Sequence, residues 1–405
     1  MISVQEAERT LAANQMVLPE ERVALRASVG RILREDVVTD RDLPPYDRVT
    51  MDGIALASSS VQQRRSWRVV GRALAGQAHQ SLADPQAECM EVATGAVLPA
   101  GCDAVVRIED VVIDAGAAAV AADLAIASGQ NIHCRGADCA AGANVLRGGN
   151  RIGAPQMAVL ASVGCAEVVV GRLPRVAVVS TGDELVAVDA PVAAHQIRRS
   201  NPDTVAAGLA SRGLTAEISH LPDDPVQLRD EIGAALARND VLITTGAVSM
   251  GSADYLPAVL ADLGVECYFN RVAQRPGRPL WVGGSAAGKR VFALPGNPVS
   301  VMACLHRYVL PFLERAMGKA PAPVLRAQLA EAFSFPPSLG LFLPVRLSSA
   351  AGQLLAAPAA TGGSGDFLGL VGTDGIAFLD GAAQTEFAAG TAVEVLTWRG
   401  QDWAA

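Results

Sequence analysis

The chain has 405 residues, of which 50% are apolar and 18% are charged, so enough apolar surface is available for a core and wholesale disorder is excluded. Its formal net charge is −8, with 33 Lys and Arg against 41 Asp and Glu. Such a chain lacks the broad positive field that attracts nucleic acid or an anionic membrane surface, so we expect neither as a partner. Any anion site must therefore be a local pocket.

The cysteines and the first residues indicate the compartment. The seven cysteines include no Cys-x-x-Cys pair, and an odd number in a long chain is typical of reduced thiols. The amino terminus has no basic stretch followed by an apolar run, as a signal peptide would, and no apolar run is long enough to cross a bilayer. We therefore expect a soluble, cytoplasmic protein.

The first residues predict helices. Ser3-x-x-Glu6 is a capping box, in which each side chain bonds to the other's backbone N–H, and it predicts a helix through about Ala13. The apolar spacing over about 20–33 predicts a second helix. The helical pattern returns over about 140–172.

A different pattern interrupts these helical regions. The prolines of Leu43-Pro44-Pro45 forbid a helix and predict an extended hinge. Short alternating runs from there to about residue 139 predict a β-rich module. We therefore predict an insertion at 43–139 within a discontinuous helical domain formed by residues 1–42 and 140–172.

Residues 173–318 alternate apolar strands with amphipathic helices. Strands are expected at 175–180, 240–244 and 290–294. Completely apolar strands joined by helices predict a parallel sheet covered on both faces, which is a three-layer α/β domain. The short strands and Gly-rich turns of 319–405 predict a small C-terminal β-barrel. The expected fold class is therefore multidomain α/β plus β.

A polar, Gly-containing loop follows each of the three apolar strands, at 180–185, 244–251 and 294–298. Carboxyl ends of parallel strands meet at one edge of a sheet, where ligands bind. Glycine lets backbone N–H groups approach an anion, and Ser and Thr hydroxyls add donors. These loops predict a phosphate site, and ordinary βα turns, which favour the same residues, are the alternative.

Charged side chains accompany these loops. Asp183, Glu184 and Asp254 are expected to bring carboxylates to the sheet edge, where they would either be solvated surface or hold Mg²⁺, which prefers oxygen ligands and bridges phosphates.

Three arginines, Arg271, Arg275 and Arg278, stand within eight residues that also contain Pro276 and Gly277. Guanidinium groups donate in a rigid fork that suits tetrahedral oxyanions. A basic surface turn is the alternative interpretation of this segment.

Taken in order, the motifs resemble the molybdopterin molybdenumtransferase family, the MoeA family, which includes the E domain of gephyrin. The resemblance runs from about residue 5 to about residue 398 and rests on the following series: Pro44-Pro45-Tyr46-Asp47, Met51-Asp52-Gly53, Thr94-Gly95-Ala96, Arg135-Gly136-Ala137-Asp138, Ser180-Thr181-Gly182-Asp183-Glu184-Leu185, Thr244-Thr245-Gly246, Val248-Ser249-Met250-Gly251, Pro276-Gly277 and Leu294-Pro295-Gly296-Asn297-Pro298.

The resemblance implies a fold, an assembly and a reaction. It implies four domains, including an α/β domain of the MogA type, and an elongated homodimer whose active cleft lies between the α/β domain of one subunit and the inserted module of the other. The implied reaction takes adenylylated molybdopterin and molybdate, releases AMP and leaves molybdenum on the dithiolene, with Mg²⁺ assisting. Contacts with the molybdopterin adenylyltransferase and with apo-molybdoenzymes are implied as well.

The resemblance also implies the site residues. It places functional positions on Asp52, Thr94, Asp138, Glu184, Asp223, Asp254, Arg271, Arg275, Pro295, Pro298 and Ser364. The loop and arginine arguments add Gly182, Asp183, Gly246, Ser249, Gly251, Arg278, Gly296 and Asn297 as substrate-binding residues. Among all of these, Asp52, Asp138, Glu184, Asp223 and Asp254 are the expected catalytic residues, and Asp183, Glu184 and Asp254 the expected metal ligands.

The chain departs from the usual pattern of the family in four places. Arginines replace the usual lysines of the basic loop, in a chain with only two lysines. Arg48-Val49 replaces Asn-Ser, Ala247 replaces Gly, and Ala137 replaces Glu. These differences leave a specialised or non-catalytic paralogue, binding molybdopterin or molybdate as a scaffold, as one alternative. A molybdopterin adenylyltransferase, which has the same type of α/β domain, is the other.

Overall fold

The computed structural model describes residues 1–246 and 255–398. Contacts divide the chain into two compact units. Unit 1 comprises residues 1–35, 148–157 and the chain from 166 onward, and unit 2 comprises residues 36–147 and 158–165. The finer division into four domains stays a prediction.

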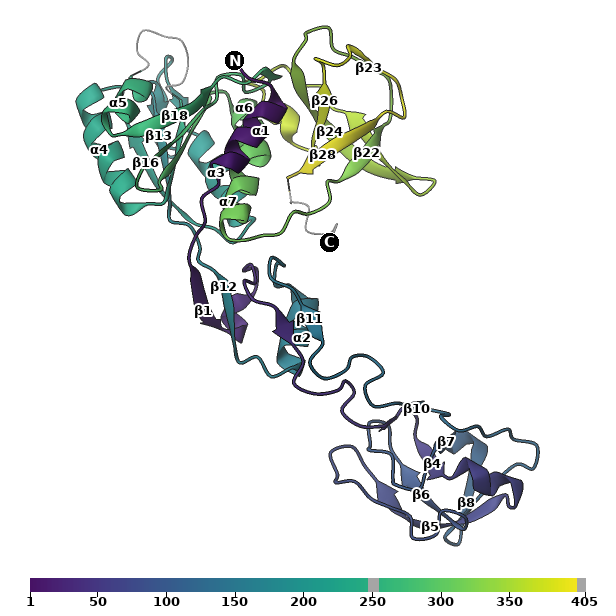
Figure 1. The fold of residues 1–405 in the computed structure, drawn as a ribbon. Helices are drawn as coiled ribbons and strands as arrows, with labels where there is room; N and C mark the ends of the chain where they lie inside the picture. Colours follow the sequence, from purple (N-terminus) through teal and green to yellow (C-terminus); the bar gives the residue numbers. More distant parts are fainter. Residues whose placement is uncertain (247–254, 399–405) are drawn as a thin grey trace. The chain divides into compact units, whose positions relative to one another are not determined.

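A six-stranded mixed sheet forms the centre of unit 1 (Figure 1). Its strand order is β16 (Ala216–Leu221), β13 (Val176–Thr181), β17 (Val241–Thr245), β21 (Arg290–Leu294), β20 (Trp281–Ser285) and β18 (Val265–Asn270). The first four strands are parallel, and the last two are antiparallel to their neighbours. The predicted strands β13, β17 and β21 are confirmed, and every position of β13 is buried. The antiparallel edge was not predicted.

Helices cover both faces of this sheet (Figure 1). The helices α3 (Asn201–Ala210), α6 (Pro298–Cys304) and α7 (Leu310–Ala316) pack into the larger core on one face. The helices α4 (Pro225–Arg238) and α5 (Leu256–Asp262) pack into a smaller core on the other. A π-helical turn, Leu305–Val309, joins α6 to α7. The predicted three-layer arrangement is therefore confirmed.

The first helix is confirmed and the second is not. Helix α1 (Val4–Ala13) begins with the predicted capping box, in which the Ser3 N–H donates to Glu6 Oε2 at 2.7 Å. The helix predicted over 20–33 is wrong, because residues Glu20–Ala24 form strand β1, followed by a 3₁₀ turn. Strand β1 pairs with β12 (Glu167–Gly171), which lies far away in the sequence. Local periodicity carries no information about so distant a partner. Helix α2 (Ala154–Ser162) is the one helix within the second helical region.

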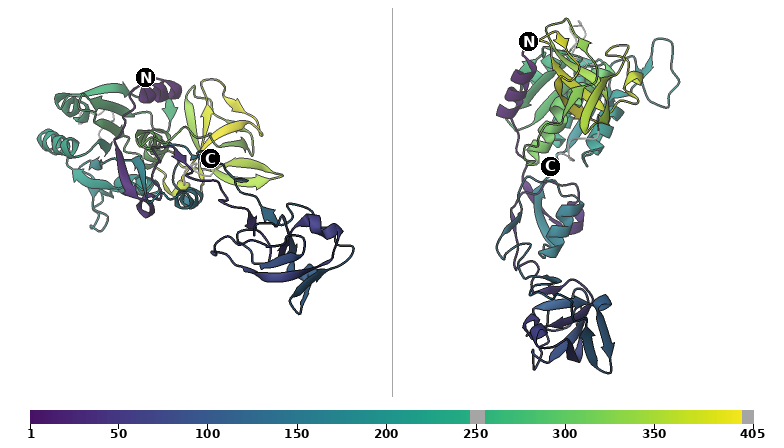
Figure 2. Two further views of the ribbon diagram at one scale, coloured as in Figure 1. Left: turned by 60° about the horizontal axis from the view of Figure 1, so that its bottom comes forward. Right: turned by 90° about the vertical axis from the view of Figure 1, so that its right-hand side faces the viewer.

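The C-terminal residues of unit 1 form a closed five-stranded barrel, shown in yellow-green beside the helices in both views of Figure 2. Its strands are β22 (Arg326–Leu329), β24 (Gly340–Ala350), β25 (Gln353–Pro358), β26 (Gly375–Asp380) and β28 (Ala392–Thr397). The barrel closes because β26 pairs with both β24 and β28. The two-residue strand β19 (Gln274–Arg275) adds to β24 from outside. Two short strands, β23 (Phe333–Ser334) and β27 (Glu386–Phe387), pair with each other. In the sequence, β23 lies between β22 and β24, and β27 lies between β26 and β28.

Unit 2 consists mainly of the predicted β-rich module. Its sheet has the order β7 (Ala104–Arg107), β4 (Gly53–Leu56), β6 (Glu88–Val92), β5 (Ser66–Ala73), β9 (Ala117–Val120) and β8 (Val111–Asp114). Apolar clusters form on both faces, and the buried Trp67 donates from Nε1 to Ser60 Oγ at 2.7 Å. Two short pairs complete the unit: β3 (Arg48–Val49) with β10 (Ile132–His133), and β2 (Val37–Val38) with β11 (Asn144–Leu146).

The structure also bears on two predictions about the whole chain, which concern its cysteines and its membrane-spanning segments. None of the seven cysteines, all of which lie in the described part of the chain, forms a disulfide. In the described part of the chain, no helix is both long enough and apolar enough to cross a bilayer.

Candidate functional site

The loops that follow β13, β17 and β21 meet at one edge of the sheet and line a cavity of about 960 Å³, which we call the cleft. Its other wall comes from the β-barrel, so the cleft lies wholly within unit 1. The residues predicted as functional that line it are Gly182, Glu184, Asp223, Gly246, Arg275, Arg278, Pro295, Gly296, Asn297 and Ser364. The structure thus brings together ten of them, from six separate segments of the chain.

The first two loops pack against each other at Gly246. This residue has φ of 96°, and a Cβ there would lie 2.8 Å from the Thr181 carbonyl oxygen, so only glycine fits. The N–H of Gly246 donates to the Leu294 carbonyl at 3.2 Å, which links it to the third loop. Thr181 also lines the cleft, and its buried hydroxyl oxygen has no hydrogen-bond partner among the described residues. The sheet edge therefore offers an unused polar group to a ligand.

Three carboxylates gather at this edge. Glu184 and Asp223 line the cleft, and the Asp223 N–H donates to Asp183 Oδ1 at 3.2 Å. Partial burial raises the pKa of Asp223, and the nearby negative charges of Asp183 and Glu184 raise it further. Within residues 1–246 and 255–398, no group of three or more His, Cys, Asp or Glu side chains is arranged to hold a metal ion by itself.

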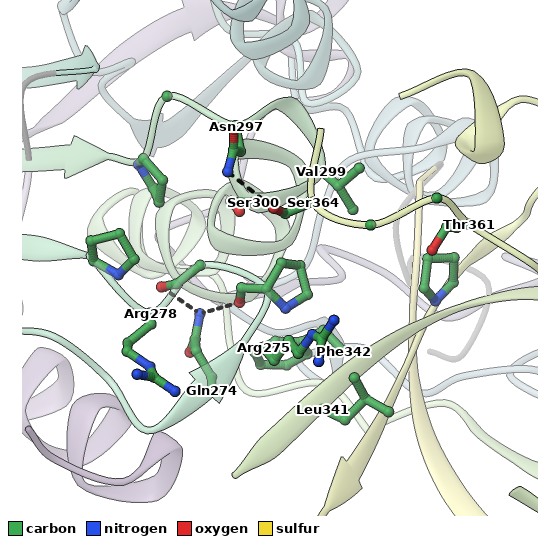
Figure 3. A pocket seen from close by; sticks show the side chains of 18 of the residues that line it. Gln274, Arg275, Arg278, Asn297, Val299, Ser300, Leu341, Phe342, Thr361 and Ser364 are labelled. Atoms are coloured by element: carbon green, nitrogen blue, oxygen red, sulfur yellow. Dashed lines mark hydrogen bonds between the residues drawn. The ribbon is translucent and has the colours of Figure 1, made fainter. Parts of the chain in front are cut away.

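The arginine loop supplies the positive charge. Arg275 and Arg278 line the cleft (Figure 3), are exposed, and have no ion-pair partner in the described chain. Two guanidinium groups are thus available to a bound anion. Arg271 does not line the cleft. It begins the same loop with φ of 85°, and its N–H donates to the Leu280 carbonyl at 3.0 Å.

A segment after the barrel strand β25 closes one end of the cleft. Asn297 Nδ2 donates to Ser364 Oγ at 3.0 Å, and the Val299 N–H donates to the Ser364 carbonyl at 3.1 Å (Figure 3). Asn201 Nδ2 donates to the Gly296 carbonyl at 2.7 Å. Ser364 is therefore placed beside the third sheet-edge loop. Pro298, by contrast, begins helix α6 and does not line the cleft.

The barrel wall of the cleft was missed by sequence reasoning. Its lining there is apolar and includes Phe333 and Phe335, in and just after β23, and Leu341 and Leu343 of β24. The short strands expected in residues 319–405 were part of a predicted β domain, but no residue pattern indicated that one of these strands would line a ligand cavity. The cleft is therefore polar and partly cationic on one side and apolar on the other, which suits a ligand with anionic groups and a ring system.

Asp52, Thr94 and Asp138 lie in unit 2. Asp52 Oδ1 accepts a hydrogen bond from the Thr94 N–H at 2.7 Å. This backbone bond, with a further bond from the Thr94 side chain, lowers the pKa of Asp52. Asp138 Oδ1 pairs with His133 Nε2 at 2.9 Å. Two of the predicted site residues, Asp52 and Thr94, are therefore in direct contact.

Three predicted site residues, Ser249, Gly251 and Asp254, lie outside the described residues. The proposed metal ligand set and the second sheet-edge loop are therefore described only in part.

Three protein-family profiles match the chain in succession. The MoeA N-terminal region (domain I and II) matches residues 2–164, a probable molybdopterin binding domain matches residues 177–315, and the MoeA C-terminal region (domain IV) matches residues 326–398. The matched regions follow the order expected from the motifs.

Relatives that align over nearly the whole chain point to the same family. The chain is 38% identical to a molybdopterin molybdenumtransferase of Synechocystis, over 98% of this chain and 100% of the relative. It is 36% identical to a protein of that name from Synechococcus elongatus, over 94% of this chain and 95% of the relative. A crystal structure of the molybdopterin biosynthesis MoeA protein from Pyrococcus horikoshii has a TM-score of 0.82 at 25% identity, covering 98% of this chain and 100% of that one.

Proposed function

The chain belongs to the MoeA family of molybdopterin molybdenumtransferases, and we propose that it inserts molybdenum from molybdate into adenylylated molybdopterin with release of AMP. The observation that carries the proposal is the cleft of this acidic protein, which is lined by the sheet-edge loops and by two arginines that form no ion pair with any described residue. The cleft is a local pocket, as any anion site in a chain of net charge −8 is expected to be.

The cleft offers charge compensation for two polyanions. Molybdate and the phosphates of adenylylated molybdopterin repel each other, and this repulsion opposes their alignment. Arg275 and Arg278 offset the repulsion and hold the tetrahedral oxyanion in a fixed place. The apolar wall formed by Phe333, Phe335 and Leu341 receives the uncharged ring portion of the substrate.

Mg²⁺ is the proposed cofactor, and the donor chemistry of the sheet edge fits it. Asp183 and Glu184 supply the oxygen ligands that a hard cation prefers, and partial burial together with the negative charges of these two residues raises the pKa of Asp223 beside them. Asp183 and Glu184 would hold the ion, although the described residues include no group of three or more such ligands. When bound, Mg²⁺ supplies positive charge to the phosphate that leaves as AMP.

We further propose that the protein acts as a homodimer, as its resemblance to the family implies, and that it does so in the cytoplasm, as the cysteine pattern predicts. In that assembly the module that carries Asp52, Thr94 and Asp138 serves the cleft of the other subunit. Asp52 and Asp138 orient the pterin or activate water. The adenylyltransferase that makes the substrate and the apo-enzymes that receive the product are the expected protein partners.

One assay tests the reaction and separates its alternatives. The purified protein is incubated with adenylylated molybdopterin, molybdate and Mg²⁺, and AMP and activation of an apo-molybdoenzyme are measured. Molybdate-dependent AMP release with activation supports the proposal. Tight binding of the substrate without turnover would instead indicate a scaffold, and ATP-dependent transfer of AMP to molybdopterin would indicate an adenylyltransferase.

A further inference from the structure

A buried amide lies directly beneath the arginine loop. The side chain of Gln274 is only 1% exposed and precedes the two cleft arginines in the chain. Its Nε2 donates to the carbonyl oxygens of Pro276 and Gly277, at 3.1 Å each (Figure 3). Its Oε1 accepts a hydrogen bond from the Tyr308 hydroxyl.

From this network we infer that Gln274, anchored by Tyr308, is the positioning residue that fixes Arg275 and Arg278 at the cleft. The inference rests on the proposed function, in which these two guanidinium groups hold molybdate. Gln274 itself does not need to touch the oxyanion, because it acts through the backbone between the two arginines.

The chemistry of the partners permits one orientation of the amide. Two carbonyl oxygens can only accept, so they require the NH₂ group, and the amide oxygen is left for the hydroxyl. Burial raises the pKa of Tyr308 well above its usual range, so the hydroxyl keeps its proton and donates it. Each polar atom of the Gln274 side chain thus has a defined partner.

The arginine loop also packs tightly against the Gln274 amide. Gly277 has φ of 86°, and a Cβ there would lie 2.6 Å from Cys304 Sγ and 2.8 Å from Gln274 Nε2. The loop is tied at its ends as well, since the Val272 N–H donates to the Arg278 carbonyl at 3.0 Å. A shift of the amide therefore has to move the backbone that carries both arginines.

An irregular turn brings Tyr308 to this place. Tyr308 lies in the π-helical turn Leu305–Val309, between α6 and α7, and is 1% exposed. Pro311 has no N–H to offer the Arg307 carbonyl four residues earlier, and its ring crowds that carbonyl, which accounts for the wider turn. Such turns are frequent at functional sites, and here the turn aims a hydroxyl at the support of the arginine loop.

The test compares two matched glutamines. Gln274→Met keeps the side-chain length and removes the amide's hydrogen bonds to the Pro276 and Gly277 carbonyls, to Cys304 Sγ and from the Tyr308 hydroxyl. Gln15→Met is the control, because Gln15 Nε2 likewise donates to two carbonyls, of Met16 and Phe312, at 3.1 Å each, away from the cleft. We expect Gln274→Met to raise the KM and the Kd for molybdate roughly tenfold, with kcat within about twofold at saturating molybdate. Gln15→Met leaves all three values near those of the unaltered protein.

Tyr308→Phe is the milder variant and covers the case in which Gln274→Met does not fold. It should raise the Kd for molybdate roughly threefold, and less than additively when combined with Gln274→Met. Tyr268→Phe is the control for Tyr308→Phe, because the Tyr268 ring stacks with Arg290 and does not line the cleft.

Hydrogen exchange gives a readout that does not depend on turnover. In Gln274→Met and Tyr308→Phe, the amides of the non-proline residues in 274–280 should exchange at least about threefold faster than in the controls. Unchanged exchange there, or unchanged molybdate affinity in stably folded variants, would overturn the inference. Absence of AMP release by the unaltered protein, with the exchange difference present, would count against the proposed function alone.

Discussion

Arg275 and Arg278 are the residues through which we propose that this acidic chain binds an anion. The molecule has a net charge of −8, yet neither guanidinium group has an ion-pair partner in the described chain. Asp183, Glu184 and Asp223 stand at the same sheet edge, so a cation bound by them would add to the positive charge of the arginines. The proposed binding would thus depend on a few residues and not on the electrostatic field of the whole molecule.

Replacement of Arg278 tests this directly. Arg278→Gln removes a charge-assisted donor, so we expect molybdate affinity to fall about tenfold, and by less at high salt, where screening already weakens the attraction. Arg346→Gln, on an exposed position of the barrel outside the cleft, is the control. Calorimetric titration at two salt concentrations measures both. Equal affinities for the two variants would contradict the role assigned to Arg278.

Asp240 is a structural carboxylate at the opposite end of strand β17 from the cleft. Partial burial alone would raise its pKa, but hydrogen bonds from Arg172 and Arg175 outweigh that effect and lower the pKa to about 2. A carboxylate with a lowered pKa contributes stability above its unfolded pKa, near 4, and loses this contribution as the pH falls toward 2.

Asp240→Asn should therefore cost about 2 kcal/mol of unfolding free energy at pH 7, and the difference from the unaltered protein should shrink as the pH falls below about 4. Urea unfolding at several pH values measures this, with the exposed Asp189→Asn as control. A difference that stays constant down to the acid limit would show that Asp240 does not act through its charge.

At the scale of elements, strands and loops of strong local pattern were predictable. Completely apolar segments followed by polar Gly loops indicated β13, β17 and β21 and the edge where they meet. The capping box indicated α1. These features depend on residues close together in the chain, which periodicity and capping chemistry describe well.

Elements that depend on distant partners were not predictable. Strand β1 was expected to be helical, but it forms through pairing with β12. The two-residue strand β19, which carries Gln274 and Arg275, exists because β24 of the barrel lies beside it. For the same reason the apolar barrel wall of the cleft, with Phe333 and Phe335, had no signal in the sequence.

A residue of the π-helical turn Leu305–Val309 leads to a second prediction about how stability depends on pH. Its residue His306 is almost completely buried and packs edge-on against Trp398, with ring centroids 5.0 Å apart. Burial, with the charge of Arg212, lowers the pKa of His306 to about 3, so the folded protein holds it neutral. The unfolded chain takes up a proton below about pH 6.5, and stability is therefore lost as the pH falls from there toward 3.

We expect His306→Phe to reduce the loss of unfolding free energy between pH 6.5 and 5 by about 2 kcal/mol relative to the unaltered protein. The exposed His195→Gln should leave this loss unchanged. Urea unfolding followed by tryptophan fluorescence at the two pH values measures it. The same acid loss in all three proteins would rule out His306 as its source.

At the scale of the whole molecule, the residues implied by the family resemblance are divided between two units. Glu184 and the arginine loop belong to unit 1, and Asp52, Thr94 and Asp138 belong to unit 2. The proposed homodimer makes this division functional, because each complete site then needs both subunits.

Complementation tests this assembly. Glu184→Gln and Asp52→Asn should each abolish molybdenum insertion when pure. When the two variants are mixed and allowed to exchange subunits, half of the dimers are mixed and each has one intact site of two, so activity should return to about a quarter of normal. If each site were formed within one subunit, every site would keep one defect and mixing would restore nothing.

The most direct measurement of the central claim is the position of bound molybdenum. Crystals soaked in molybdate, with data collected at the molybdenum absorption edge, should show an anomalous peak in the cleft within hydrogen-bond distance of Arg275 or Arg278. A strong peak elsewhere, with the cleft vacant at a molybdate concentration that saturates the reaction, would contradict the account.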